Sequence, residues 1–276
     1  MTTGRSDGHR HLAAWRDPRA NLRFWIVAGL GLALDLWSKG WAFRTLDAGE
    51  SRPILSGVLE FRRSLNPGAV FGLGAGLVTV FIAASALALM FVLFLFIGSS
   101  KRHRALHVAL GMILAGALGN LYDRSFVKAE VVRWRTAAGD LRTDVGVVRS
   151  DVREGLIGLG TWPDGSDPRL IPATSVLDIR GQGVVRDFIH IIPEFPSWVP
   201  IAGGRSIWPW IFNVADSLLV CGVLLLMGHL WRTGEPARTE RAGGQAAANP
   251  PALETPGRGA TSAAEARGDA VGNIRS

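Results

Sequence analysis

Residues 207–230 form an apolar stretch that also carries an acidic side chain, Asp216. About 20 apolar residues in a helix cross the hydrocarbon core of a bilayer, so this stretch is long enough to span a membrane. A carboxylate inside a membrane helix costs roughly 2.5–3.5 kcal/mol on insertion scales. The stretch therefore predicts a membrane helix, and its acid predicts a functional site around Asp216.

Three further apolar runs precede it in the sequence. Together with a hydrophobic share of 48%, they indicate a membrane protein. The first run is too long for a cleaved signal peptide, and no small-residue cleavage site follows it. We therefore expect an all-α membrane protein with four transmembrane helices and small β-rich extracytoplasmic elements. The helices are expected at about 22–43, 77–98, 105–123 and 207–231.

The polar segments complete the expected organisation. Residues 1–21 are Arg-rich and are interpreted as a cytoplasmic leader, whereas residues 233–276 have almost no large apolar residue, which predicts a disordered cytoplasmic tail. Residues 127–182 alternate charged and apolar patches between turn signals, which predicts an inserted β-rich module outside the cytoplasm. The four helices would then form one domain from residues 22–126 and 183–232.

Charge in the short loops predicts the orientation of the helices. Lys and Arg precede the first run, separate the second from the third, and follow the fourth. Because such residues stay on the cytoplasmic side, both termini are expected in the cytoplasm. The net charge of +7 is explained in this way without a nucleic-acid partner.

With this orientation, the costly polar residues collect near the outer face. Asp35 and Lys39 are four positions apart, so they share a helix face and can pair. The pair could merely neutralise itself, but charges within membrane helices usually face a bundle interior, which favours a role in supporting a site. The other members of this group are Asn66, Asn120, Asp123, Arg124, Asp187, Asn213 and Asp216.

The residue types at this level favour one chemistry. The six histidines form no metal-binding spacing, so we expect no metal and no cofactor. Ser217 has no suitably placed base, and Cys221, the one cysteine, is interpreted as a small packed residue. Two carboxylates in a low-dielectric site cannot both ionise cheaply, so one keeps a proton, as in aspartic proteases.

Four stretches resemble the motif boxes of lipoprotein signal peptidase (signal peptidase II), a bacterial intramembrane aspartyl protease with four helices. They are SLNPGAVFG at 64–72, GALGNLYDR at 116–124, VVRDFI at 184–189 and FNVADS at 212–217. Asp35 and Lys39 also fit the first helix of that family. The resemblance covers about residues 22–126 and 183–232.

The resemblance implies a role for each candidate residue. Asp187 and Asp216 would be the catalytic dyad. The supporting and substrate-binding residues would be Asn66, Gly68, Asn120, Asp123, Arg124, Asn213, Asp35 and Lys39. The implied substrate is a prolipoprotein carrying a diacylglyceryl group, held in membrane lipid and cut before the lipidated cysteine. The implied location is the bacterial inner membrane, with the site near the outer face.

The sequence departs from the family pattern at two places. An insertion of roughly 50–55 residues separates Arg124 from Asp187, judged from ordinary connection lengths. Arg186 replaces the usual apolar residue before Asp187, where a cation would lower the pKa of Asp187 or point into water.

Two other functions fit the sequence less well. A small proton-coupled transporter would need polar residues through the full membrane depth, and the inner halves of the runs lack them. An inactive relative that binds an envelope partner through the insertion is disfavoured because both dyad positions are acidic.

Overall fold

The computed structural model describes residues 13–68 and 78–234. Most of the expected leader, the second half of the motif at 64–72 and nearly all of the expected tail lie outside the described residues. The chain divides into two units, Met1–Arg232 and Thr233–Ser276. The elements and the site, apart from the last two residues of the final helix, belong to the first unit.

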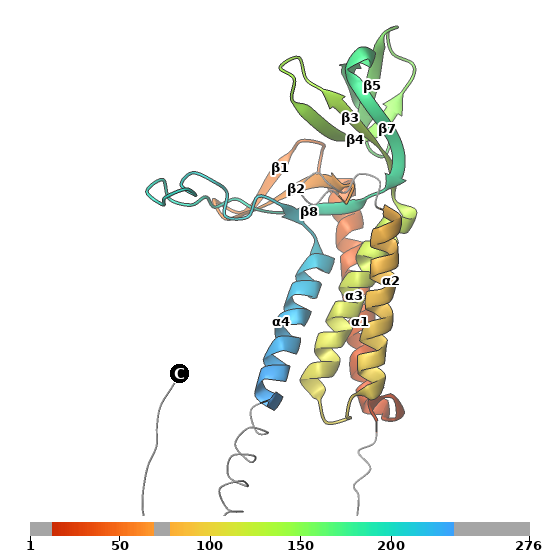
Figure 1. The fold of residues 1–276 in the computed structure, drawn as a ribbon, viewed down its shortest axis with the longest axis vertical. Helices are drawn as coiled ribbons and strands as arrows, with labels where there is room; N and C mark the ends of the chain where they lie inside the picture. The colour runs from red at the N-terminus through yellow and green to blue at the C-terminus, as the bar shows by residue number, and fades with distance from the viewer. Residues whose placement is uncertain (1–12, 69–77, 235–276) are drawn as a thin grey trace, which may run out of the picture. The chain divides into compact units, whose positions relative to one another are not determined.

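Within residues 13–68 and 78–234, four α-helices form the apolar part of the structure (Figure 1). They are α1 (Pro18–Thr45), α2 (Val78–Gly98), α3 (Arg104–Phe126) and α4 (Val214–Gly234), preceded by the short helix η1 (Ala14–Arg16). The helix α1 starts at a proline, after Asp17, whose carboxylate accepts a hydrogen bond from Ala20 N at 2.8 Å. This is a capped helix start of the ordinary kind.

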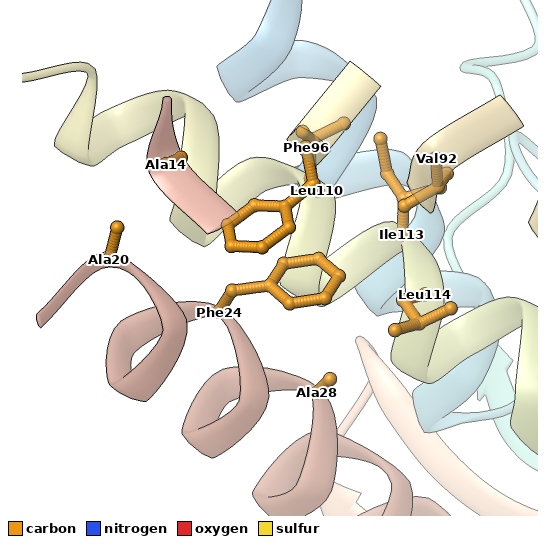
Figure 2. Packing of buried hydrophobic residues seen from close by; sticks show 9 residues of the cluster. All are labelled: Ala14, Ala20, Phe24, Ala28, Val92, Phe96, Leu110, Ile113 and Leu114. Atoms are coloured by element: carbon orange, nitrogen blue, oxygen red, sulfur yellow. The ribbon is translucent and has the colours of Figure 1, made fainter. Parts of the chain in front are cut away.

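The three helices α1, α2 and α3 pack around an apolar core. The rings of Phe24 and Phe96 stack at 4.1 Å between centroids, and Leu110 of α3 packs against them (Figure 2). The helix α4 contacts α3 through small residues. A Cβ at Gly116 would clash with the carbonyl oxygen of Ala215, so the two backbones lie against each other there.

The expectation of an all-α protein with four transmembrane helices is wrong. In the described part of the chain, nine strands form two antiparallel sheets. Among the described residues, three helical segments are long and apolar enough to cross a membrane: Pro18–Thr45, Arg104–Phe126 and Val214–Thr233. The apolar segment counted for α2, Ile82–Gly98, is shorter than these three.

The fourth helix also begins later than expected, at Val214 instead of 207. Pro209 has no backbone N–H to donate in a helix. The residues after it, Ile211–Phe212, instead form the short strand β9. Apolar composition alone therefore overestimated the length of this helix.

The first sheet joins segments that are distant in the sequence. Its strands are β1 (Ser51–Leu55), β2 (Leu59–Asn66), β8 (Val185–Ile191) and β9, in the order β1-β2-β8-β9. The strand β8 contacts α1 and α3, and Figure 1 shows the sheet at the C-terminal end of these two helices. In the β2–β8 register, Ser64 lies opposite Asp187. The sheet thus holds the Asn66 segment and the Asp187 segment together.

The insertion forms the second sheet, which agrees with the β strands predicted there. Its order is β6-β5-β4-β3-β7. The bounds are β3 (Lys128–Arg135), β4 (Leu141–Arg149), β5 (Leu156–Thr161), β6 (Ser166–Pro172) and β7 (Val176–Gly183), with the short helix η2 (Ala173–Ser175) before β7. Its own apolar cluster includes Trp134, Leu159 and Ile171.

The two ends of the insertion meet. Val184 N donates to Val127 O at 3.0 Å, so the chain leaves α3 and returns to β8 at adjacent points. A Cβ at Gly183 would clash with the carbonyl of Arg124, and glycine permits this approach. Trp162 joins the insertion to the rest of the unit: its ring lies edge-on to Phe43 at 5.9 Å between centroids, and its carbonyl accepts from Arg63.

Candidate active site

The two acids that the sequence singled out are brought together by different elements. Asp187 lies within strand β8, and Asp216 lies in the first turn of α4. Asn213, immediately before the helix, caps it: Asp216 N donates to Asn213 Oδ1 at 3.0 Å, and Asn213 N donates to Asp216 Oδ2 at 3.2 Å. This reciprocal pair has the geometry of a capping box, with an acid at the favourable, positive end of the helix.

The side-chain amide of Asn213 links the two acids. Its Nδ2 donates to Asp187 Oδ1 at 2.6 Å, while its backbone and side-chain oxygen hold Asp216. Asn213 is fully buried. One side chain therefore fixes the strand-borne acid relative to the helix-borne acid.

Two more asparagines complete the carboxylate contacts. Asn120 Nδ2 donates to Asp216 Oδ1 at 2.8 Å, and Asn66 Nδ2 donates to Asp187 Oδ2 at 3.1 Å. Gly68 N in turn donates to Asn66 Oδ1 at 2.9 Å, and Gly68 has φ +84°, a conformation that glycine adopts readily. Each carboxylate oxygen of the pair thus accepts a hydrogen bond from an amide group.

A buried ion pair lies behind the asparagines. Lys39 Nζ donates to Asp35 Oδ2 at 2.8 Å and to Asn120 Oδ1 at 3.1 Å, and both charged side chains are fully buried. Asp35 Oδ1 accepts from Ala215 N at 2.8 Å, at the start of α4. The pair therefore orients Asn120 and holds the first turn of α4.

The sequence left two possibilities for Arg186, a cation acting on Asp187 or a side chain pointing into water, and the structure shows a third. The charge of Arg186 is directed at Asp123 of α3. Its Nη2 donates to Asp123 Oδ1 at 2.6 Å, and its backbone N donates to Oδ2 at 3.0 Å. Asp123 is also 3.4 Å from Lys39 Nζ. The residue beside Asp187 thus anchors β8 to α3. Sequence spacing gave no sign of this ion pair, because the insertion lies between its members.

Burial controls the protonation of Asp187. Only 2% of this residue is exposed. Loss of hydration, and secondarily the charge of Asp216, raise the pKa of Asp187 to about 7, although hydrogen bonds from Asn213 and Asn66 oppose the shift. Asp187 can therefore hold a proton near neutral pH while remaining hydrogen-bonded on both oxygens.

The other predicted residue, Arg124, lies in the last turn of α3, where the charges of Asp216, Asp187 and Asp123 act on its guanidinium. All ten predicted residues therefore fall in or directly behind one cluster. Within residues 13–68 and 78–234, no group of three or more His, Cys, Asp or Glu side chains is arranged to hold a metal.

An apolar cavity of about 290 Å³ opens beside Asp216. Its lining consists of Ile191, Trp208, Phe212, Asp216, Ser217, Val220 and Cys221. The sequence reasoning missed this cavity and interpreted Cys221 as a packed core residue, whereas its side chain is exposed. The four-residue spacing of Asp216 and Val220, which puts both on one face of α4, was the available signal.

Comparison with known proteins shows that the chain is a protease. It belongs to the signal peptidase II family: the family profile described as signal peptidase (SPase) II matches residues 27–232. The resemblance predicted from the four motif boxes is confirmed.

The chain is similar to individual proteins of known sequence or structure. A protein of Desulfitobacterium hafniense named lipoprotein signal peptidase is 34% identical over 203 residues, covering 74% of this chain and 89% of the relative. One of the same name from Rhodopirellula baltica is 31% identical over 209 residues, covering 74% and 69%. A solved structure of a bacterial membrane enzyme is 20% identical, has a TM-score of 0.47, and covers 76% of this chain and 88% of its own.

Proposed function

We propose that this chain is an intramembrane aspartyl endopeptidase that removes the signal peptide from diacylglyceryl-modified prolipoproteins, cutting before the lipidated cysteine. The observation that carries the proposal is the pair of acids tied together by Asn213. Family membership supports the substrate class, because the relatives are named lipoprotein signal peptidase.

The proposed reaction uses the two acids in different protonation states. Asp187, whose pKa is raised to about 7 by burial, carries the proton, and ionised Asp216 takes a proton from the attacking water. The proton of Asp187 stabilises the developing oxyanion of the scissile carbonyl. The proton on Asp216 then passes to the leaving amine, and the peptide bond breaks.

The surrounding residues would hold the substrate and the pair of acids. Arg124 and Asn120 would bind the substrate backbone and the active-site loops, while Asn66, with Gly68, would keep Asp187 oriented. Asp35, Lys39 and Asp123 would support them from behind. The apolar cavity beside Asp216 suits an apolar part of a lipid-modified substrate.

The proposed location is the bacterial cytoplasmic membrane, crossed more than once, with both termini in the cytoplasm. The start of α1 and the α2–α3 turn lie together, since Ala14 N donates to Ser99 O at 2.8 Å. His103 before α3 and His229 near the end of α4 have ring centroids 5.0 Å apart. This end is rich in Lys and Arg, which supports a cytoplasmic position for it and, in the proposed orientation, an outer-face position for the acids. The proposed peptidase domain remains residues 22–126 with 183–232, and residues 127–182 the inserted module.

The test is cleavage of a lipid-modified prolipoprotein by membranes containing Asp187→Asn or Asp216→Asn. Each change keeps the side-chain volume and one carboxamide oxygen that can still accept a hydrogen bond, but it removes acid–base chemistry. Turnover should therefore fall at least about 1,000-fold, the range lost when a catalytic group is removed. Asp140→Asn, in an exposed turn of the insertion, is the matched control and should keep wild-type turnover. Near-normal cleavage by either dyad variant would refute the assignment.

A further inference from the structure

A second pocket lies at the opposite end of the helices from the pair of acids. It has a volume of about 320 Å³ and is lined by Asp17, Arg19, Arg23, Lys101, Arg102 and Arg104. Two segments build it: the start of α1 and the turn between α2 and α3. Five cations therefore face one cavity with a single acid.

The charges in this pocket are not balanced by other described residues. Asp17 already accepts the hydrogen bond that caps α1, from Ala20 N at 2.8 Å. Across residues 13–68 and 78–234, none of the five cations takes part in an ion pair. Like charges held close together repel, so a bound anion would relieve the repulsion.

Arg23 gives the pocket an unused donor. Its Nη2 donates to Lys101 O at 3.3 Å and lies 3.4 Å from His107 Nδ1, contacts that leave the guanidinium charge uncompensated. Its Nε is buried and, among the residues that the structure describes, has no hydrogen-bond partner. A buried donor without a partner costs about 1–3 kcal/mol, which a ligand oxygen would recover.

The helix α3 adds backbone donors at the same place. It begins at Arg104, whose N–H donates to Arg102 O at 2.9 Å, and the residue before it, His103, makes no side-chain capping bond with the described part of the chain. The first N–H groups of a helix carry a partial positive charge and lack partners within the helix. Together with Arg23 and the surrounding cations, they favour an oxyanion with several acceptor oxygens, such as a phosphate.

The surface beside the pocket is apolar. On α1, Leu22, Trp25 and Ile26 flank Arg23 and are exposed. On the inner side of the same turn, Phe24 is buried against Phe96 and Leu110, as Figure 2 shows. A ligand seated in the pocket would therefore have its charged group among cations and its remainder along an apolar helix face.

We propose that this pocket binds the phosphate headgroup of an anionic phospholipid of the cytoplasmic leaflet, with the acyl chains lying along Leu22, Trp25 and Ile26. Basic pockets between helices at the cytoplasmic side commonly hold such headgroups. The site is separate from Asp187 and Asp216, so binding there does not depend on the proposed cleavage reaction.

The test measures lipid binding by the full chain in neutral detergent, by native mass spectrometry, with phosphatidylglycerol, phosphatidylcholine and inorganic phosphate as three separate probes. Phosphatidylglycerol should bind in preference to phosphatidylcholine, and millimolar inorganic phosphate should not displace it. The double variant Arg19→Gln/Arg102→Gln changes two exposed side chains and should weaken phosphatidylglycerol binding roughly 30-fold, from about 1 kcal/mol per cation.

The control variant is Arg62→Gln/Arg142→Gln, which removes the same charge from two exposed positions in the sheets and should bind like the wild type. Equal binding of the two lipids, or unchanged phosphatidylglycerol binding by the Arg19/Arg102 variant, would overturn the proposal. Full displacement of the lipid by inorganic phosphate would overturn the choice of a lipid ligand.

Discussion

Replacing Arg186 by Met tests whether the ion pair with Asp123 anchors the strand that carries Asp187. In the wild type, Asp123 Oδ1 accepts from Arg186 Nη2 at 2.6 Å and from Nε at 3.2 Å. Met keeps much of the apolar stem of Arg but removes both donors. Oδ1 of a fully buried carboxylate would then lose its Arg186 donors, while Oδ2 would keep Lys39 and a backbone N–H.

The expected loss of stability depends on the contact that Lys39 keeps with Asp123. Breaking a buried ion pair generally costs about 3–5 kcal/mol, because a charge is left uncompensated. Since Lys39 still neutralises part of the charge, we expect about 2–3 kcal/mol. At roughly 2–4 °C per kcal/mol for a chain of this size, the melting temperature in detergent should fall by about 4–12 °C.

The matched control is Arg180→Met, which breaks the ion pair between Arg180 and Asp178. The Arg180 side chain is 57% exposed and the Asp178 side chain is 30% exposed. Surface pairs of this kind contribute about 0–1 kcal/mol, so its melting temperature should barely change. The double variant Asp123→Leu/Arg186→Met removes both charges and should recover part of the loss. If Arg186→Met melted within 1–2 °C of the Arg180→Met control, about the spread expected of a surface pair, the anchoring role would be refuted.

Three further predictions concern other parts of the molecule. Gly116→Ala should destabilise the chain by about 1–3 kcal/mol in thermal melts, because its Cβ would clash with the Ala215 carbonyl, whereas Gly29→Ala, with open space around it, should not; equal effects would contradict the close α3–α4 contact. Because burial raises the pKa of Asp187 from 3.8 to about 7, the folded state binds the extra proton between these values, so stability should fall as pH rises from about 4 to about 7. Asp187→Asn should remove this pH dependence of stability. If the stability of Asp187→Asn fell with pH as steeply as that of the wild type, another group would be its cause. Deleting 128–182 with a short linker should leave a folded chain, since Val127 and Val184 are hydrogen-bonded, and loss of the folded form in size-exclusion chromatography would argue otherwise.

Local patterns were sufficient to predict much of the site. Asp35 and Lys39 were expected to pair because helix geometry places residues four apart on one face, and they do so at 2.8 Å. An acid within an apolar stretch pointed to Asp216 without knowledge of its partners. These predictions depend on contacts within one helix, which sequence spacing specifies directly.

Contacts between distant segments could not be predicted in the same way. The Arg186–Asp123 ion pair joins residues on either side of the insertion, and only the return of the chain beside Val127 brings them together. The start of α4 at Val214 depends on the pairing of β9 with β8, a tertiary contact that overrides the apolar composition of 207–213. The all-α expectation failed for a related reason, since the pairing of β2 with β8 joins two segments on either side of the insertion.

The meeting of Val127 and Val184 has a consequence for how the chain closes its largest loop. The antiparallel β3–β7 pairing brings the ends of the insertion together, so the entropy of closing this loop is offset within the module and does not strain β8. Residues added or removed at the far turns, such as that at Gly139, would change the length of the path from α3 to Asp187 without changing its end points. A backbone break at that turn should therefore yield two co-expressed fragments that assemble and keep Asp187 beside Asp216.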